Sequence, residues 1–168
     1  MAIARAIITK KDMVMKKSPY TRSTAEIRFQ DLHPKFIGYL RSYAELHKLG
    51  EIEQDVRSCF VTTNRKKGLL GGVQTDFTVV CMTGRFLFWG IISDKKETGV
   101  AAAQWSEISE IRDWKDSSMG AVMEDQGVEI LGFIYQDSKR GFWFIGLDNE
   151  PAGMKCRALL QEMIAAKK

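Results

Sequence analysis

The sequence predicts an α+β fold in which seven antiparallel strands form a barrel or sandwich, with a C-terminal helix capping it and an extra N-terminal helix before it. Two segments, at 34–48 and 148–168, have the apolar spacing of amphipathic helices. Between them lie seven β-rich segments that turn residues, not helices, separate. The 168-residue length suits one domain, and 45% hydrophobic with 27% charged residues is typical of a folded chain.

The first helix is expected at residues 34–48. Pro34 suits a first helical turn, and Asp31 or His33 precedes it as a cap. Gly50 is expected to supply the left-handed position that ends the helix. Five apolar residues recur at helical spacing and form one stripe: Phe36, Ile37, Leu40, Tyr43 and Ala44.

The β segments are expected at 58–63, 75–82, 85–92, 100–105, 108–114, 128–135 and 141–147. In the second of them Phe77, Val79 and Cys81 alternate onto one face. The Thr-Gly pair before the third segment predicts a hairpin turn. The tryptophans are assigned to packing between strands, and Trp114 is expected to be the most exposed of them.

The C-terminal helix is predicted from its start signals and its stripe. Asp148 or Asn149 can cap it, and Pro151 lies early in it. Because an open barrel leaves one mouth uncovered, this helix is expected to bury its stripe there. The stripe consists of Cys156, Leu159, Leu160, Met163 and Ile164.

Three motifs follow one another ahead of this helix. Residues 79–89 read Val-Val-Cys-Met-Thr-Gly-Arg-Phe-Leu-Phe-Trp, a polar-isoleucine pattern follows at 105–112, and a glycine-aromatic strand at 141–147. In this order they resemble the bacterial PH-like and GRAM-like domains of the pleckstrin-homology superfold, over residues 57–168. The resemblance implies a PH-like seven-stranded barrel, and many such domains are adaptors.

The chain is divided into a basic arm (1–30), a helical segment (31–56) and a PH-like domain (57–168). Residues 1–24 hold six basic groups and one acid, a net charge of +5, so with +4 for the whole chain the other 144 residues carry −1. The arm is expected to be solvated or bound to a partner, with organelle import as the alternative. Its candidate contacts are Lys10, Lys11, Lys16, Lys17 and Arg22.

A second basic cluster, Arg65, Lys66 and Lys67, lies beside three glycines between the first two β segments. Glycines and cations can wrap an anion, and the resemblance implies that this loop could bind lipid headgroups. The alternative is a flexible, solvated hairpin loop, and the following strand carries Asp76 and no cation. Arg85 completes the candidate anion site, although it is also expected to pair with a carboxylate or to lie over Trp89.

The remaining residues predict no catalytic chemistry. His33 and His47 lie in or beside the first helix, and no acidic or cysteine spacing suits a metal ion, so we expect no enzyme, cofactor or small-molecule substrate. The near-neutral body also argues against specific nucleic-acid binding. Three widely spaced cysteines predict a reducing intracellular compartment, most simply the cytoplasm, and no apolar run is long enough to span a membrane.

These observations predict a noncatalytic interaction module that binds a protein partner or forms a homo-oligomer. The basic arm and the stripe of the 34–48 helix are its expected contacts. The alternative is a peripheral binder of anionic membrane lipids, acting through residues 65–67 and the arm, since each cation near an anionic surface adds about 1 kcal/mol.

Overall fold

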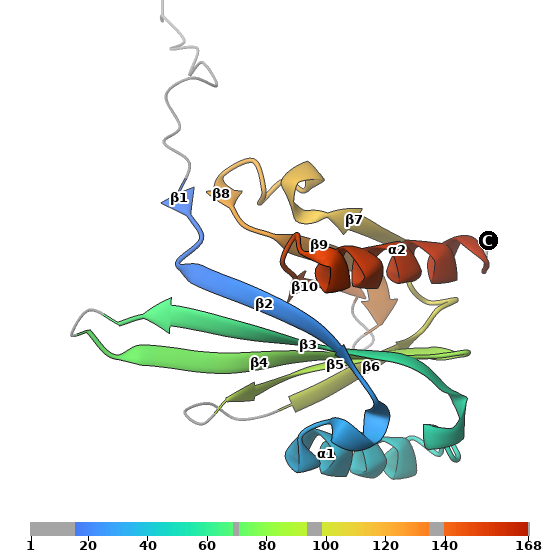
Figure 1. The fold of residues 1–168 in the computed structure, drawn as a ribbon. Helices are drawn as coiled ribbons and strands as arrows, with labels where there is room; N and C mark the ends of the chain where they lie inside the picture. The colour runs from blue at the N-terminus through green and yellow to red at the C-terminus, as the bar shows by residue number, and fades with distance from the viewer. Residues whose placement is uncertain (1–15, 69–70, 94–98, 135–139, 168) are drawn as a thin grey trace, which may run out of the picture.

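The computed structural model describes residues 16–68, 71–93, 99–134 and 140–167, which form an α+β fold with two antiparallel sheets (Figure 1). The larger sheet has the strand order β2 (Tyr20–Ile27), β3 (Val56–Lys67), β4 (Val73–Thr83), β5 (Phe86–Ser93) and β6 (Gly99–Gln104). The smaller sheet has the order β10 (Arg140–Gly146), β9 (Gly127–Ile134) and β7 (Glu110–Asp113). All seven predicted strands are therefore confirmed.

Helix α1 (Pro34–Leu46) covers the outer face of the larger sheet. Its Phe36, Leu40 and Ala44 are buried in one cluster with Val79 and Cys81 of β4. The predicted helix and stripe are confirmed, but the stripe belongs to the core and is not free for a partner. Over residues 79–82 both faces of β4 are consequently apolar, because a helix covers one and a sheet covers the other.

The inner core lies between the two sheets, and helix α2 (Pro151–Ala165) closes it. Cys156, Leu160 and Ile164 are buried there, which confirms the predicted C-terminal stripe. The predicted barrel closure is wrong for the described residues: α2 contacts both β2 and β7. Because the helix has to bury its stripe, it occupies the space that a closing ladder between these two strands would need.

Strand β2 was not predicted, since its residues were assigned to the basic arm. It pairs with β3 over its whole length, from Tyr20 opposite Lys66 to Ile27 opposite Cys59. Just before it, β1 (Lys16–Lys17) pairs in parallel with β8 (Met123–Glu124). The basic segment therefore contributes an edge strand to the larger sheet.

Two local predictions need correction. Helix α1 ends with Lys48 in the left-handed region at φ 53°, two residues before Gly50, and the Leu49 N–H donates to the Ala44 carbonyl. Trp114 is buried, because the short 3-10 helix η3 (Trp114–Asp116) tucks its ring against Phe144 and its Nε1–H donates to the Met123 carbonyl at 2.8 Å. No helix in the described ranges is long and apolar enough to cross a membrane.

Candidate functional site

The inner face of the larger sheet changes from apolar to polar toward the β3–β4 hairpin. Phe60 and Val80 are core residues, whereas the next residues of β3 and β4 on that face are polar. Since opposed residues on neighbouring strands share a face, strand register brings seven polar side chains together there. This polar strip consists of Arg22, Thr24, Thr62, Asn64, Asp76, Thr78 and Ser93.

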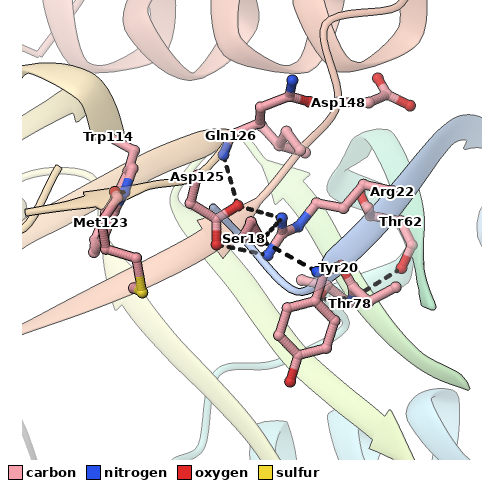
Figure 2. Close-up of polar contacts among 12 residues, drawn as sticks. Ser18, Tyr20, Arg22, Thr62, Thr78, Trp114, Met123, Asp125, Gln126 and Asp148 are labelled. Atoms are coloured by element: carbon pink, nitrogen blue, oxygen red, sulfur yellow. Dashed lines mark hydrogen bonds and ion pairs between the residues drawn. The ribbon is translucent and has the colours of Figure 1, made fainter. Parts of the chain in front are cut away.

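Arg22 of the polar strip forms a two-pronged ion pair with Asp125, on the segment between β8 and β9 (Figure 2). The two side chains are only 7% and 5% exposed, and Arg22 Nη1 also donates to Ser18 Oγ at 3.3 Å. Gly146 of β10 leaves room for the guanidinium, because a Cβ there would lie 2.3 Å from Nε. Arg22, predicted to contact a partner, is instead bound inside the protein.

Asp148 ties β2 to the start of α2. Its Oδ2 accepts a hydrogen bond from the Thr24 N–H, and its Oδ1 accepts one from the Glu150 N–H at 3.1 Å. The Thr24 hydroxyl lies 3.0 Å from the Thr62 hydroxyl. At the other end of β2, the Tyr20 N–H donates to Ser18 Oγ. Side chains therefore cap the free backbone edge of β2.

Asn64 and Asp76 face each other across β3 and β4, and each has one oxygen without a donor. Asn64 Nδ2 donates to Thr78 Oγ1 at 2.9 Å, and Gln74 Nε2 donates to Asp76 Oδ2 at 3.0 Å. The Oδ1 atoms of both residues are buried and have no hydrogen-bond partner within the described structure. Buried acceptors without a donor on two directly opposed residues are uncommon in folded proteins.

The predicted basic cluster lies at the end of β3, not in a loop. Strand alternation puts Lys66 on the inner face, with its Nζ 5.7 Å from the centre of the Tyr20 ring. Arg65 and Lys67 are exposed on the other face. The three cations therefore do not converge on one point. Arg85 lies over the Phe86 ring at 5.2 Å, not over Trp89, which is fully buried.

Only part of the predicted arm site can be placed. Lys10 and Lys11 lie outside the described residues. The backbone of Lys16 and Lys17 forms β1, and the Lys17 side chain is exposed. Of the predicted arm contacts, Lys17 is thus placed at the surface and Arg22 in the interior.

The β6 edge, like the Asn64–Asp76 pair, has polar groups without a hydrogen-bond partner among the described residues. Strand β6 reads Gly-Val-Ala-Ala-Ala-Gln and forms one edge of the larger sheet. The Gln104 N–H points away from β5 and donates to Glu107 Oε2 at 2.9 Å. By strand alternation, Val100 and Ala102 also direct their N–H and C=O groups outward. No described residue caps these groups.

The environments of the cysteines and of His33 indicate structural roles. Cys59 and Cys81 face each other with their sulfur atoms 3.3 Å apart, and this hydrogen bond together with burial raises the pKa of the Cys81 thiol. Burial raises the pKa of Cys156 to about 12. Since the thiolate is the nucleophilic form, these environments suppress reactivity. His33 Nδ1 caps α1 by accepting from the Lys35 N–H, and no metal-binding group occurs in the described part of the chain.

Comparison with known proteins gives no identification: no family model, no curated protein and no solved structure matches this chain. Fold class by itself does not specify an activity, because one fold supports many functions. The residues of the polar strip, the exposed cations and the β6 edge are therefore the features from which a function can be inferred.

Proposed function

We propose that the protein is a noncatalytic interaction module with a PH-like arrangement of two sheets and a C-terminal helix, and that it assembles with a second copy of itself. The order of elements supports the PH-like arrangement: β3 to β6 pair in succession, the strands of the smaller sheet follow, and α2 closes the core. The outward backbone groups of Val100 and Ala102 on the β6 edge, which no described residue caps, carry the proposal of self-assembly.

An open strand edge pairs readily with another strand, and proteins that stay monomeric protect such edges with charges, proline or covering side chains. Strand β6 contains no charged residue and no proline. On the opposite edge of the same sheet, Ser18 and Asp148 cap backbone groups of β2. On β6 the side chain of Glu107 caps only the last residue, Gln104, and no described residue caps the outward groups of Val100 and Ala102. These two residues are therefore the part of the sheet edges suited to pairing.

A second copy fits this edge because antiparallel pairing about a two-fold axis is self-complementary. With Ala101 on the axis, Val100 of each copy faces Ala102 of the other, and both pairs exchange backbone hydrogen bonds. No like charges meet, and the alanine side chains are small. Helix α1 contacts β5 and β6, and it carries the exposed apolar residues Tyr39 and Leu46.

Size-exclusion chromatography with light scattering on the full chain tests this assembly. Wild type is expected at about twice the 19.1 kDa chain mass at about 100 µM. Ala102→Pro, which removes an outward N–H, is expected to be a folded monomer, and Ala102→Ser, which keeps it, a dimer. A monomeric wild type, or a dimer that survives Ala102→Pro, contradicts the proposal.

A second candidate function, binding to an anionic membrane surface, is supported by the hairpin end of the larger sheet. Exposed Arg65 and Lys67 share a face there, and exposed Val73 lies directly opposite Lys67. In vesicle flotation, salt-sensitive binding to anionic but not neutral vesicles is expected. Loss of binding in Arg65→Glu/Lys67→Glu, but not in the control Lys48→Glu/Lys115→Glu, supports this function; no flotation at low salt refutes it.

We further propose a reducing intracellular compartment. All three cysteines are buried and none is in a disulfide, and the sulfur atoms of Cys59 and Cys81 lie 3.3 Å apart. Mass spectrometry of protein purified with an alkylating reagent present throughout is expected to find three free thiols. An intact Cys59–Cys81 disulfide contradicts this location.

A further inference from the structure

We infer that Asn64 and Asp76 form a binding site for a small organic cation that carries N–H donors, such as a primary ammonium group. The site lies in the polar strip on the inner face of the larger sheet. It is independent of self-assembly at β6, because β5 separates β4 from that edge.

Burial and register define this site. Asn64 and Asp76 are directly opposed on β3 and β4, and are only 7% and 6% exposed. Asn64 Nδ2 donates to Thr78 Oγ1 at 2.9 Å and to the Thr62 carbonyl at 3.4 Å. Because a carbonyl can only accept, the second contact orients the amide and leaves Oδ1 as an acceptor. Asp76 Oδ1 is a second acceptor, and neither atom has a donor within the described structure. Buried acceptors are normally hydrogen-bonded, so these two oxygen atoms require a donor that the described residues do not supply.

The charge of the site selects the kind of donor. A buried carboxylate requires a counter-charge, and Gln74, which donates to Asp76, is neutral. Arg22, in register with Asn64, is already paired with Asp125. Lys66, next on the inner face, has its Nζ over the Tyr20 ring. No described cation therefore neutralises Asp76.

A monovalent cation with N–H donors supplies both the missing hydrogen-bond donors and the missing positive charge. One ammonium group can donate to Asn64 Oδ1 and Asp76 Oδ1 together and balance the single negative charge. A divalent metal ion is disfavoured, since such ions take several oxygen ligands and bind tightly only with more carboxylates than one. Tyr20, Lys66 and Gln74, all partly exposed on the inner face, border the site on the hairpin side.

The test is thermal unfolding of the full chain in about 200 mM methylammonium chloride and in tetramethylammonium chloride of equal concentration. The second cation carries charge but no N–H donor, so it controls for ionic strength. With a Kd near 20 mM, methylammonium is expected to raise Tm by about 3–5 °C over the tetramethylammonium value. Equal Tm values in the two salts, as a buried water at the site would give, overturn the inference.

Three variants locate the effect. Asp76→Asn is expected to abolish the Tm difference between the salts, and to unfold at a higher Tm than wild type in tetramethylammonium chloride, because it removes the unpaired charge. Asp116→Asn, an exposed control, and Lys66→Met are expected to keep the difference. A difference that survives Asp76→Asn shows that methylammonium acts elsewhere, and a lower Tm for that variant in tetramethylammonium chloride shows that Asp76 already has a partner charge. Either result overturns the inference.

Discussion

Replacing Arg22 with methionine is expected to lower the free energy of unfolding by about 3–5 kcal/mol. The substitution leaves Asp125 as a carboxylate that is 5% exposed and has lost its counter-ion. Methionine keeps an unbranched apolar side chain between the Tyr20 and Phe144 rings, which lie 5.2 and 5.5 Å from the guanidinium carbon. The decrease in the free energy of unfolding therefore reflects mainly the unpaired charge of Asp125, not lost packing.

A double-mutant cycle separates the ion pair from other effects of the substitution. Asp125→Asn alone leaves the guanidinium buried beside Gly146 without a counter-charge. In the double variant neither charge remains, so its loss is expected to be smaller than the sum of the single losses by about 2–3 kcal/mol. Since single domains are stable by only about 5–15 kcal/mol, this coupling is a large share of the total.

Urea unfolding followed by tryptophan fluorescence measures the cycle. The control is Arg28→Met, because Arg28 pairs with Asp31 at the surface, where the side chains are 73% and 47% exposed. Exposed pairs contribute at most about 1 kcal/mol, so the control is expected to change little. If Arg22→Met lowers the free energy of unfolding no more than Arg28→Met, the argument from burial is wrong. Arg22 is then again a candidate contact for a partner.

Three further predictions follow from packing and titration. Leu40→Ala, on the buried face of α1, is expected to lower the free energy of unfolding by about 2–5 kcal/mol in urea, and Leu46→Ala, at 73% exposure, by less than about 0.5 kcal/mol. Gly146→Ala is expected to lower Tm because its methyl lies 2.3 Å from the arginine Nε, and Gly38→Ala, with open space in a helix, to raise it; shifts of the same sign contradict this. The pKa of the Cys156 thiol is about 12 in the folded chain and ordinarily 9.0, so the unfolded state loses this proton first as the pH rises. The free energy of unfolding is therefore expected to fall between these two pH values. Urea unfolding at several pH values is expected to show a weaker pH dependence for Cys156→Ala.

Both α-helices and the strands from β3 to β7, β9 and β10 were predictable because their signals are local. Alternation at Phe77 and Val79, and the helical spacing from Phe36 to Leu40, each depend on a few neighbouring residues. Barrel closure is not local: it depends on whether α2 or another strand lies between β2 and β7. The spacing of the C-terminal stripe predicts that the helix is buried, but not which gap it fills.

The candidate site could be predicted only in part. The sequence singles out Asp76 as a lone acid, but Asn64 becomes its neighbour only through the register of the β3–β4 hairpin. Arg22 was grouped with the arm because its charge is visible in the sequence and its burial is not. Its partner Asp125 is 103 residues away, and no local pattern connects the two. The polar alternation in β2 was the one available signal for a strand, and the surrounding basic residues obscured it.

The two edges of the larger sheet make the proposals separable by experiment. Asp148 and Ser18 hold β2 by hydrogen bonds, so the polar strip is expected to keep its geometry whether or not a second copy binds at β6. Ala102→Pro removes an outward group two strands away from Asp76 and is expected to leave the methylammonium response intact. Asp76→Asn, conversely, is expected to leave the dimer intact. A variant that abolishes both properties indicates that the sheet itself has unfolded, because no described contact connects the two positions directly.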